Sequence, residues 1–481
     1  MVSSEYAPLA KSGGLADAVS SLATALRREG ADVRVVMPRY GFIPQAKLQP
    51  LPEPLGVPIG LREEWVGVYT HDQEVPVYLL DHQELFGRPG IYNESGLDYA
   101  DNARRFSLLS YGAFQIARML HWIPDIIHGH DWPTALAPVF LEGLERAEEF
   151  AGTASVLTIH NIGYQGIFAS EQFVHTRLPW SEFSSLGLEF HGSMNLLRGG
   201  IVTAEILTTV SGRYAEEILT PEGSFGLHET LLPRRDRLYG VLNGIDTETW
   251  DPEEDPALPE PFSADDLAGK AAAKGEVQRR FGLEEAPRIP LIASIGRIAE
   301  QKGIRHLFAD HGGAVERLCR EEEIQMVLIG SGDQQYEERI RRLSMELPNY
   351  GIHIGYDEEL SHLVTAGADF FLMPSQYEPC GLNQMYSMRY GTVPIVSSTG
   401  GLADTVVDEK GGKGATGFMI ESVSELQIVQ TVQRALEVYR ERPERISQLQ
   451  QAGMAQDFSW GRRARSYLEL YDEALRLRSR R

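Results

Sequence analysis

The chain has 481 residues and a formal charge of −23, from 45 basic and 68 acidic side chains. This length predicts two or three domains, and the acidic excess argues against a nucleic-acid or anionic-membrane surface, because both need a basic face. No apolar run approaches the roughly 20 residues that cross a bilayer, no signal peptide is visible, and two cysteines cannot build a disulfide framework, so we expect a cytoplasmic protein.

Short apolar runs rich in β-branched residues recur along the chain, and helical periodicities lie between many of them. Such runs predict an α/β fold with parallel sheets that helices cover on both faces. Only Met1–Ser4 precede the first glycine loop, so the strand expected before it is very short unless the start of the chain is truncated. The expected strands are Val33–Met37, Ile126–His128, Ser155–His160, Ile206–Val210, Tyr239–Leu242, Leu291–Ile295, Met326–Ile329, Phe370–Met373 and Val393–Val396.

The composition changes near the middle of the chain. The stretch Asp251–Asp266 is rich in Pro, Glu and Asp, which is typical of a surface connector. We therefore place a first domain at 1–244, a connector at 245–284 and a second domain at 285–462. The stretch Ser466–Leu477 then has apolar and aromatic residues at helical spacing, which predicts a final helix.

The pentapeptide Gly-Gly-Leu-Ala-Asp occurs twice, at Gly13–Asp17 and at Gly400–Asp404. Hydroxyl residues lie just upstream of each copy, and a helix-like pattern follows it. A glycine loop that leads into a helix N-terminus is a natural seat for phosphate, because backbone N–H groups and the helix dipole face the anion. Two copies, one in each α/β half, suggest two nucleotide-type folds that hold one charged ligand.

Two basic residues follow a single expected strand in the second half. In open parallel sheets, ligands bind beyond the carboxyl ends of the strands. Arg297 and Lys302 follow Leu291–Ile295, so both are placed to reach the same phosphates. There they would neutralise the charge that grows as a diphosphate leaves, which is electrostatic catalysis. The alternative is that both are solvated surface charges.

Polar residues also end strands in the first half. His160 and Asn161 would suit hydrogen bonds to sugar hydroxyls, although a histidine there can equally be a capping or core residue. His128 and His130 lie one residue apart beside Asp131, which hints at a metal. No third ligand or cysteine cluster supports zinc, so we expect no metal.

A carboxylate and a thiol follow the strand Phe370–Met373. Glu378 is placed to hold sugar hydroxyls near the reacting carbon, and the alternative is an acidic helix N-terminal residue that the helix dipole stabilises. Cys380 has no evident His and Asn partners of a nucleophilic set, so a packing role is favoured.

Taken together, these motifs resemble those of the bacterial glycogen synthase and plant starch synthase family over nearly the whole chain. Two positions depart from the family pattern and keep its chemistry, since Ser12 stands in place of Thr and Arg198 in place of Lys. The matching runs are Lys11–Asp17, His128–Trp132, Thr158–Asn161, Leu242–Asp246, Gln301–Gly303, Glu378–Gly381 and Ser398–Asp404.

The resemblance implies the GT-B architecture, with two Rossmann-like domains facing across a deep cleft and a C-terminal helix, 463–481, that crosses back to the first domain. It implies transfer of glucose from ADP-glucose to the non-reducing end of an α-1,4-glucan (glycogen), with retention of configuration and without a cofactor. No convincing pair of carboxylates for double displacement is visible. This favours front-face substitution, in which the departing diphosphate accepts the proton of the acceptor.

The resemblance also implies roles for single residues. Arg297 and Lys302 would hold the phosphates, and Tyr356 would stack on the adenine. The residues expected to take part in catalysis are Arg297, Lys302, Glu378, His160 and Asp131. Those expected to bind substrate are Lys11, Gly13, Gly14, Asp17, Asn161, Asn243, Tyr356, Cys380, Gly381, Thr399, Gly400 and Gly401.

Other functions stay open at this point. A synthase of the same fold that uses UDP-glucose, and a catalytically silent glucan-binding protein, would share these motifs. A glucan phosphorylase would need pyridoxal phosphate on a lysine. A dehydrogenase would need a Gly-x-Gly-x-x-Gly run after a strand, which we do not find. The sequence does not define the oligomeric state.

Overall fold

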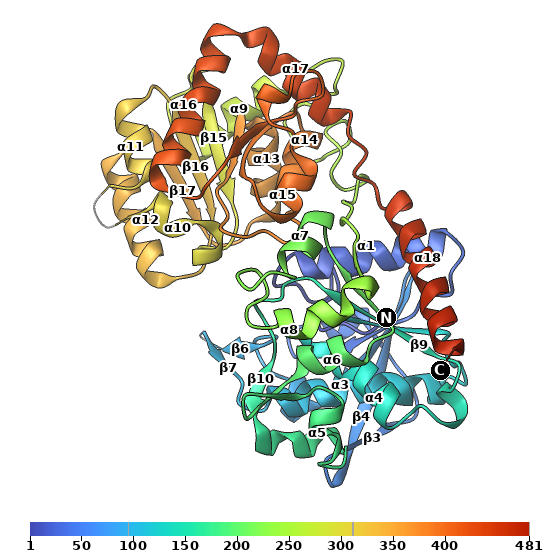
Figure 1. The fold of residues 1–481 in the computed structure, drawn as a ribbon. Coiled ribbons are helices and arrows are strands. Elements are labelled where there is room, and N and C mark those ends of the chain that lie inside the picture. The colour runs from blue at the N-terminus through green and yellow to red at the C-terminus, as the bar shows by residue number, and fades with distance from the viewer. Residues whose placement is uncertain (95, 310–311, 481) are drawn as a thin grey trace. The chain divides into compact units, whose positions relative to one another are not determined.

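In the computed structural model the chain divides into two compact units (Figure 1). Unit 1 comprises Met1–Gly244 and Ser459–Arg481, and unit 2 comprises Ile245–Phe458. Each unit has its own largely parallel sheet with helices packed against it, which confirms the predicted α/β class with two Rossmann-like domains. The structure describes residues 1–94, 96–309 and 312–480.

The parallel strands of unit 1 are β1 (Val35–Pro38), β5 (Pro76–Asp81), β8 (Ile126–His130), β9 (Ala154–Ile159), β13 (Ile206–Thr209) and β14 (Leu238–Gly240). They form two groups, β5-β1 and β8-β9-β13-β14, and Val2 lies between them. Val2 makes parallel bridges to Gly129 and to Val36. Its N–H donates to the carbonyl of His128 at 2.8 Å, while the N–H of Val36 donates to the carbonyl of Met1 at 2.9 Å. The first residues therefore act as the very short strand that the sequence predicts.

An antiparallel extension continues the sheet beyond β5. Strand β4 (Arg62–Asp72) pairs with β5, and β2 (Gln49–Pro50) and β3 (Leu55–Ile59) pair with β4. The sequence did not predict β5 or these three strands. The remaining short strands are β6 (Asn93–Glu94), β7 (Leu97–Asp98), β10 (Ile167–Ala169), β11 (Glu189–Phe190) and β12 (Ser193–Asn195).

Helix α1 (Gly14–Arg28) forms as its apolar spacing predicts. Its buried face includes Val19, Leu22, Ala23 and Leu26, whose spacing of i, i+3, i+4 and i+7 places them on a single side. The chain leaves the helix through Gly30, whose φ of +100° suits glycine. The other helices before residue 244 are α2 (Gln83–Phe86), α3 (Asn102–Met119), α4 (Leu136–Gly143), α5 (Glu182–Ser185), α6 (Leu196–Thr203), α7 (Gly212–Glu217) and α8 (His228–Leu231).

Helix α18 (Trp460–Ser479) belongs to unit 1, although unit 2 precedes it in the chain. It packs against α1 and β9 (Figure 1). Near its end, the Arg478 guanidinium lies 3.6 Å from a carboxylate oxygen of the buried Glu205. The hydrophobic side chains that it buries are Trp460, Ala464, Tyr467 and Ala474.

Unit 2 contains a six-stranded parallel sheet. Its strands are β15 (Leu291–Ile295), β16 (Gln325–Gly330), β17 (Tyr350–Ile354), β18 (Phe370–Met373), β19 (Val393–Ser397) and β20 (Phe418–Ile420). The order across the sheet is β17-β16-β15-β18-β19-β20. Numbered from β15, this order is 3-2-1-4-5-6, which is the Rossmann arrangement.

The segment 245–284, which we expected to be a connector, forms part of unit 2. The Trp250 ring stacks between the rings of His362 and Tyr386, at centroid distances of 3.7 and 3.8 Å. Asp255 Oδ2 lies 2.7 Å from His362 Nδ1, and both residues are buried. The segment also supplies a helix, α9 (Ala268–Arg280), which packs against α13 (Glu358–Gly367).

The helices of unit 2 are α9 (Ala268–Arg280), α10 (Ile304–Leu307), α11 (Ala314–Glu321), α12 (Gln334–Glu346), α13 (Glu358–Gly367), α14 (Asn383–Arg389), α15 (Gly400–Thr405), α16 (Glu425–Glu441) and α17 (Pro443–Met454). Across the described residues of both units, no helix has the length and apolar character that a membrane span requires. Cys319 and Cys380 are buried and form no disulfide.

Candidate active site

Both sheets have a point at which the strand order reverses. In unit 1 it lies between Val2 and β8, and in unit 2 it lies between β15 and β18. The chain leaves the two strands at this point toward opposite faces of the sheet, which leaves a crevice for a ligand at the carboxyl ends of these strands. Each unit therefore has one edge at which a ligand is expected.

Glu5 holds the loop that precedes α1 in unit 1. This carboxylate is 2% exposed, and it accepts hydrogen bonds from the Ser12 N–H at 2.6 Å and from the Ser12 hydroxyl at 2.7 Å. Beside the loop, Lys11 Nζ lies 2.9 Å from Asp17 Oδ2, and both side chains are partly exposed. The predicted residues gathered at the start of α1 are Lys11, Gly13, Gly14 and Asp17.

The Tyr92 hydroxyl joins the same cluster. It donates to Glu5 Oε1 at 2.6 Å and lies 2.8 Å from Ser4 Oγ. Burial, reinforced by the charge of Glu5, raises the pKa of Tyr92 well above its usual value, so the phenol keeps its proton. Neither Glu5 nor Tyr92 was predicted. An acidic residue directly after the first strand was a usable signal for Glu5, whereas Tyr92 lies 87 positions away and had none.

Asp131 lies in a turn after β8 with a φ of +60°, which few residues other than glycine adopt. Its Oδ1 accepts the N–H of His160 at 2.7 Å and that of Asn161 at 3.2 Å. The carboxylate thus ties the turn after β8 to the turn after β9. Burial raises the pKa of Asp131 to about 7, with help from the charge of Glu5 and against the two backbone hydrogen bonds. Both protonation states of Asp131 are therefore accessible near neutral pH.

The His160 imidazole is neutral, because burial lowers its pKa to about 3. Its Nε2 lies 3.0 Å from His130 Nδ1. Asn161 uses its side-chain carbonyl to accept the N–H of Gly163 at 3.0 Å. Asn243 is buried and follows β14, which β13 separates from β9. Neutral imidazole and amide groups at this edge suit hydrogen bonds to hydroxyl groups.

The hint of a metal at His128 and His130 has a different explanation. His128 Nδ1 lies 2.8 Å from the Tyr471 hydroxyl, and His128 Nε2 lies 2.6 Å from Thr158 Oγ1. Both ring nitrogens of His128 therefore contact neutral hydroxyl groups. In the part of the chain that the structure describes, no three His, Cys, Asp or Glu side chains are grouped to hold a metal ion.

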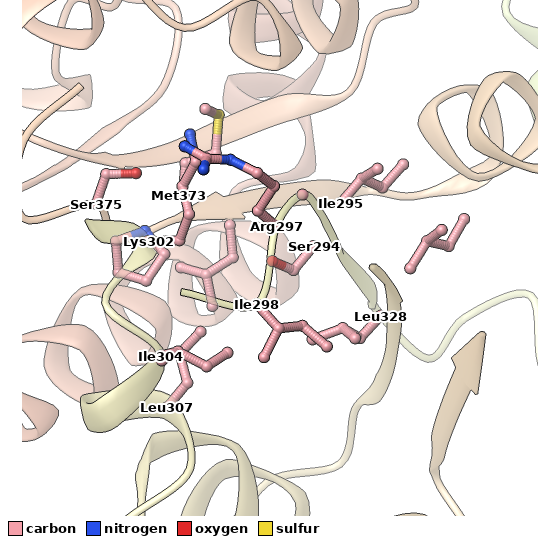
Figure 2. Close-up of a pocket in the computed structure, with 14 residues that line it drawn as sticks. Ser294, Ile295, Arg297, Ile298, Lys302, Ile304, Leu307, Leu328, Met373 and Ser375 are labelled. Atoms are coloured by element: carbon pink, nitrogen blue, oxygen red, sulfur yellow. The ribbon is translucent and has the colours of Figure 1, made fainter. Parts of the chain in front are cut away.

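In unit 2, Arg297 and Lys302 line one small cavity, of about 30 Å³, at the carboxyl end of β15 (Figure 2). Arg297 Nη2 donates to Gln301 Oε1 at 3.0 Å, and Gln301 Nε2 donates to the carbonyl of Tyr377 at 3.2 Å. The loop after β15 is thus bonded to the loop after β18. The two predicted cations lie at the reversal point of the sheet, on loops that support each other.

Glu378 pairs with Lys302. Its Oε2 lies 2.5 Å from Lys302 Nζ and accepts the Ser375 hydroxyl at 2.9 Å. The Glu378 side chain is 7% exposed, whereas that of Lys302 is 27% exposed. The carboxylate therefore has a fixed position, and the ammonium group keeps a face toward solvent.

The second glycine pair allows two loops to touch. The N–H of Gly401 donates to the carbonyl of Glu378 at 3.0 Å, and a Cβ on Gly401 would lie 2.1 Å from the Cys380 carbonyl oxygen. Gly400 has a φ of +42°, and a Cβ there would lie 2.0 Å from the Glu378 carbonyl oxygen. Any larger residue would push Glu378 away from Lys302.

Around Thr399–Gly401, where the sequence predicts substrate binding, two main-chain N–H groups donate within the protein. The N–H of Thr399 donates to the Ser397 carbonyl at 3.0 Å, and the N–H of Gly401 is used as described above. These two groups are therefore bonded within the protein. Gly381, with a φ of +70°, and the buried Cys380 form the turn that leads toward α14.

Tyr356 follows β17, which β16 separates from β15. The residue is 66% exposed, and an aromatic ring can stack on a planar partner. In strand order it lies two strands from Arg297 and Lys302, on the side of β15 opposite to Thr399–Gly401, which follow β19.

Two family profiles cover most of the chain. Residues 1–232 match the starch synthase catalytic domain, and residues 278–451 match the glycosyl transferases group 1. The glycogen synthase of Treponema denticola is 45% identical over 99% of this chain and 98% of that protein. The glycogen synthase of Myxococcus xanthus is 44% identical over 98% of both chains.

Solved structures give the same result. The catalytic domain of starch synthase IV from Arabidopsis thaliana, bound to ADP and acarbose, has a TM-score of 0.91 with 33% identity over 98% of each chain. Sucrose-phosphate synthase from Thermosynechococcus elongatus has a TM-score of 0.58 with 18% identity, over 98% of this chain and 95% of its own. That second likeness concerns the fold alone.

Proposed function

Because the chain belongs to the glycogen and starch synthase family, we propose that it transfers glucose from ADP-glucose to the non-reducing end of an α-1,4-glucan, with retention of configuration. The observation that carries the proposal is the pair of cations, Arg297 and Lys302, at the reversal point of a Rossmann-like sheet. The related starch synthase structure, bound to ADP and acarbose, supports a nucleotide sugar and a glucan as ligands.

Unit 2 would act on the donor's diphosphate. Arg297 offers a planar set of N–H donors and Lys302 a compact charge, so together they match two neighbouring phosphates. Held in place before the reaction, they stabilise the negative charge that develops on the leaving group. We assign Tyr356 to the adenine because it is an exposed aromatic residue just beyond the carboxyl end of β17.

Unit 1 would act on the sugar. His160, Asn161 and Asn243 are neutral hydrogen-bonding groups that suit hydroxyls and bring no positive charge to a phosphate. Lys11 and Asp17 flank the glycine loop, with Gly13 and Gly14 in the turn itself. The other residues that we assign to the substrates are Asp131, Glu378, Cys380, Gly381, Thr399, Gly400 and Gly401.

For the chemical step we infer front-face substitution. Glu378 is held by Lys302 and Ser375, so it is not placed as a nucleophile. As the bond between C1 and the diphosphate oxygen breaks, the 4-hydroxyl oxygen of the glucan bonds to C1 from the same face. Its proton passes to a departing phosphate oxygen. The products are ADP and a glucan one glucose longer, and the configuration is retained.

The donor is tested with radiolabelled ADP-glucose and UDP-glucose in parallel, with and without glycogen and a metal chelator. We expect label in glycogen from ADP-glucose, no effect of the chelator, and slower transfer from UDP-glucose. Preference for UDP-glucose would select the alternative synthase. Retention of glycogen without turnover of either donor would select a silent glucan-binding protein.

The role of the cations is tested with Lys302→Ala. We expect kcat to fall by about 10²–10³-fold, because the developing charge loses a pre-formed partner, while binding of glycogen stays unchanged. Lys413→Ala, at an exposed lysine of the same unit, is the matched control and should keep full activity. Equal losses in turnover and in glycogen binding would contradict the assignment.

We also propose a cytoplasmic location. Neither of the two cysteines, Cys319 and Cys380, forms a disulfide in the structure, which fits a reducing compartment. Fractionation of the source cells with an activity assay would test it, and activity in an extracellular fraction would contradict it.

A further inference from the structure

His130 is a buried histidine for which the proposed reaction has no use. It is 0% exposed, and its Nδ1 lies 3.0 Å from Nε2 of His160. Its other nitrogen, Nε2, is buried and makes no hydrogen bond to the described residues. Burial lowers the pKa of His130 well below its usual value, and His128 and His160 add to the effect, so the ring is neutral.

These contacts select one tautomer of His130. A neutral imidazole carries one N–H and one bare nitrogen. If the proton were on Nε2, a buried N–H would have no acceptor. Such donors are rare, because the free energy lost on removing them from water is not recovered by a hydrogen bond in the protein. If the proton is on Nδ1, the N–H is bonded to His160 and only a bare lone pair is left over. The second arrangement costs less.

The tautomer of His130 in turn determines that of His160. When His130 Nδ1 donates, His160 Nε2 must accept, so the proton of the neutral His160 ring is on Nδ1. His160 is only partly buried, and Nε2 is the nitrogen that its neighbour occupies. The nitrogen left for a ligand is therefore Nδ1, and it carries a hydrogen.

Neighbouring groups keep His130 in place. The His128 and His130 rings pack at a centroid distance of 4.2 Å. His128 is bonded at both nitrogens, to Tyr471 of α18 and to Thr158 of β9. The His130 N–H of the main chain donates to Thr134 Oγ1 at 2.5 Å. With its backbone bonded and one ring face covered, His130 has little freedom to rotate.

We propose that His130 is a positioning residue that holds His160 as its Nδ1–H tautomer, so that His160 recognises its ligand as a hydrogen-bond donor. The ligand atom must then be an oxygen with a free lone pair. If the ligand is the glucose of the proposed function, a hydroxyl there accepts from His160 and directs its own proton elsewhere. The tautomer itself does not depend on that function.

The proposal is tested by long-range ¹H–¹⁵N NMR of the imidazole rings in ¹⁵N-histidine-labelled full-length protein, with His160→Gln to assign the His160 signals. In the unsubstituted protein we expect a protonated Nδ1 and a bare Nε2 on His160. A protonated Nε2 on His160 would overturn the proposal, whether or not the protein transfers glucose.

Two variants of His130 test the positioning role. His130→Asn keeps an amide N–H near the place of Nδ1, whereas His130→Leu removes it. We expect His130→Leu to give mixed tautomers of His160 and to lower kcat about 10-fold or more with a smaller change in KM, and His130→Asn to restore both. A pure Nδ1–H signal in His130→Leu, or equal loss in both variants, would overturn the role. If His130→Leu fails to fold, the His160 tautomers of the unsubstituted protein and of His130→Asn still test the proposal.

Discussion

At the scale of single residues, two oppositely charged side chains that we assign to the substrate form an ion pair with each other in this structure. Lys302 Nζ contacts Glu378 Oε2 at 2.5 Å. A diphosphate that takes Lys302 must therefore replace Glu378 as its partner, and the carboxylate, which Ser375 still holds, is then available to sugar hydroxyls. The pair keeps the ammonium group in place until the donor arrives.

This exchange predicts an unusual effect of Glu378→Gln. Removing a residue that contacts a ligand normally weakens binding. Here the substitution removes the carboxylate that competes with the diphosphate for Lys302. We expect ADP, which has no glucose, to bind about 10-fold more tightly, equivalent to about 1.4 kcal/mol, while glucose transfer falls. Titration calorimetry with ADP measures the change, with Glu441→Gln at an exposed position as control. Unchanged or weaker ADP binding would refute the exchange.

The sequence predicted the residues whose type and strand-end position both point to chemistry, such as Lys302, Glu378 and His160. It missed Glu5, and it proposed no role for His130 beyond a weak metal hint. The reason is that these residues act through partners brought close by the fold: Glu5 through Tyr92, 87 positions away, and His130 through His160, 30 positions away. No pattern in a single sequence reports such pairs.

At the scale of elements, the strands that are buried on both faces were predictable. Strands such as β9 and β16 are buried at every residue, so they appear as continuous apolar runs. β17 was missed because three of its five residues are partly exposed, and β3 because its burial alternates, as expected for an antiparallel ribbon. The sequence predicts a connector at 245–284 because Pro and acidic residues dominate part of that segment. The two residues that anchor it in unit 2, Trp250 and Asp255, stand singly and form no recognisable pattern.

Those anchors predict how Asp255→Asn behaves. The Asp255 carboxylate lies 2.7 Å from His362 Nδ1 and accepts the Tyr390 hydroxyl at 2.5 Å. Loss of its charge should lower the free energy of unfolding of unit 2 by about 2 kcal/mol at neutral pH, measured by urea unfolding. Asp265→Asn, exposed in the same segment, should have no effect.

The pH dependence follows from the pKa of Asp255. Burial alone would raise it, but the hydrogen bonds from His362 and Tyr390 outweigh that effect and hold it below its usual 3.8. A carboxylate with a lowered pKa in the folded state stabilises fully above its unfolded pKa, and the gain is lost as the pH falls through the folded one. The difference between the unsubstituted protein and Asp255→Asn should therefore be constant above about pH 5 and shrink below pH 3.8. A constant difference down to pH 3 would contradict this account.

At the scale of the whole molecule, the chain passes from unit 1 to unit 2 and back. The two crossing points are neighbours, since the N–H of Ile245 donates to the Phe458 carbonyl at 2.9 Å. Unit 2 is thus a continuous insertion in unit 1, and α18 completes a unit whose other elements end more than two hundred residues earlier. Unit 2 carries its own sheet, core and cation pair.

This organisation predicts different outcomes when the units are expressed separately. Residues 245–458 should fold alone, with one cooperative urea transition, and bind ADP more weakly than the full chain. Residues 1–244 alone should not fold cooperatively, because α18 buries Trp460, Ala464, Tyr467 and Ala474, at about 1.5–3 kcal/mol for each of the larger side chains, against a total stability of about 5–15 kcal/mol. A fusion of 1–244 to 459–481 through a short Gly-Ser linker should restore the transition, since the crossing points are adjacent. Cooperative unfolding of 1–244 without the helix would show that α18 is an accessory element rather than part of the core of unit 1.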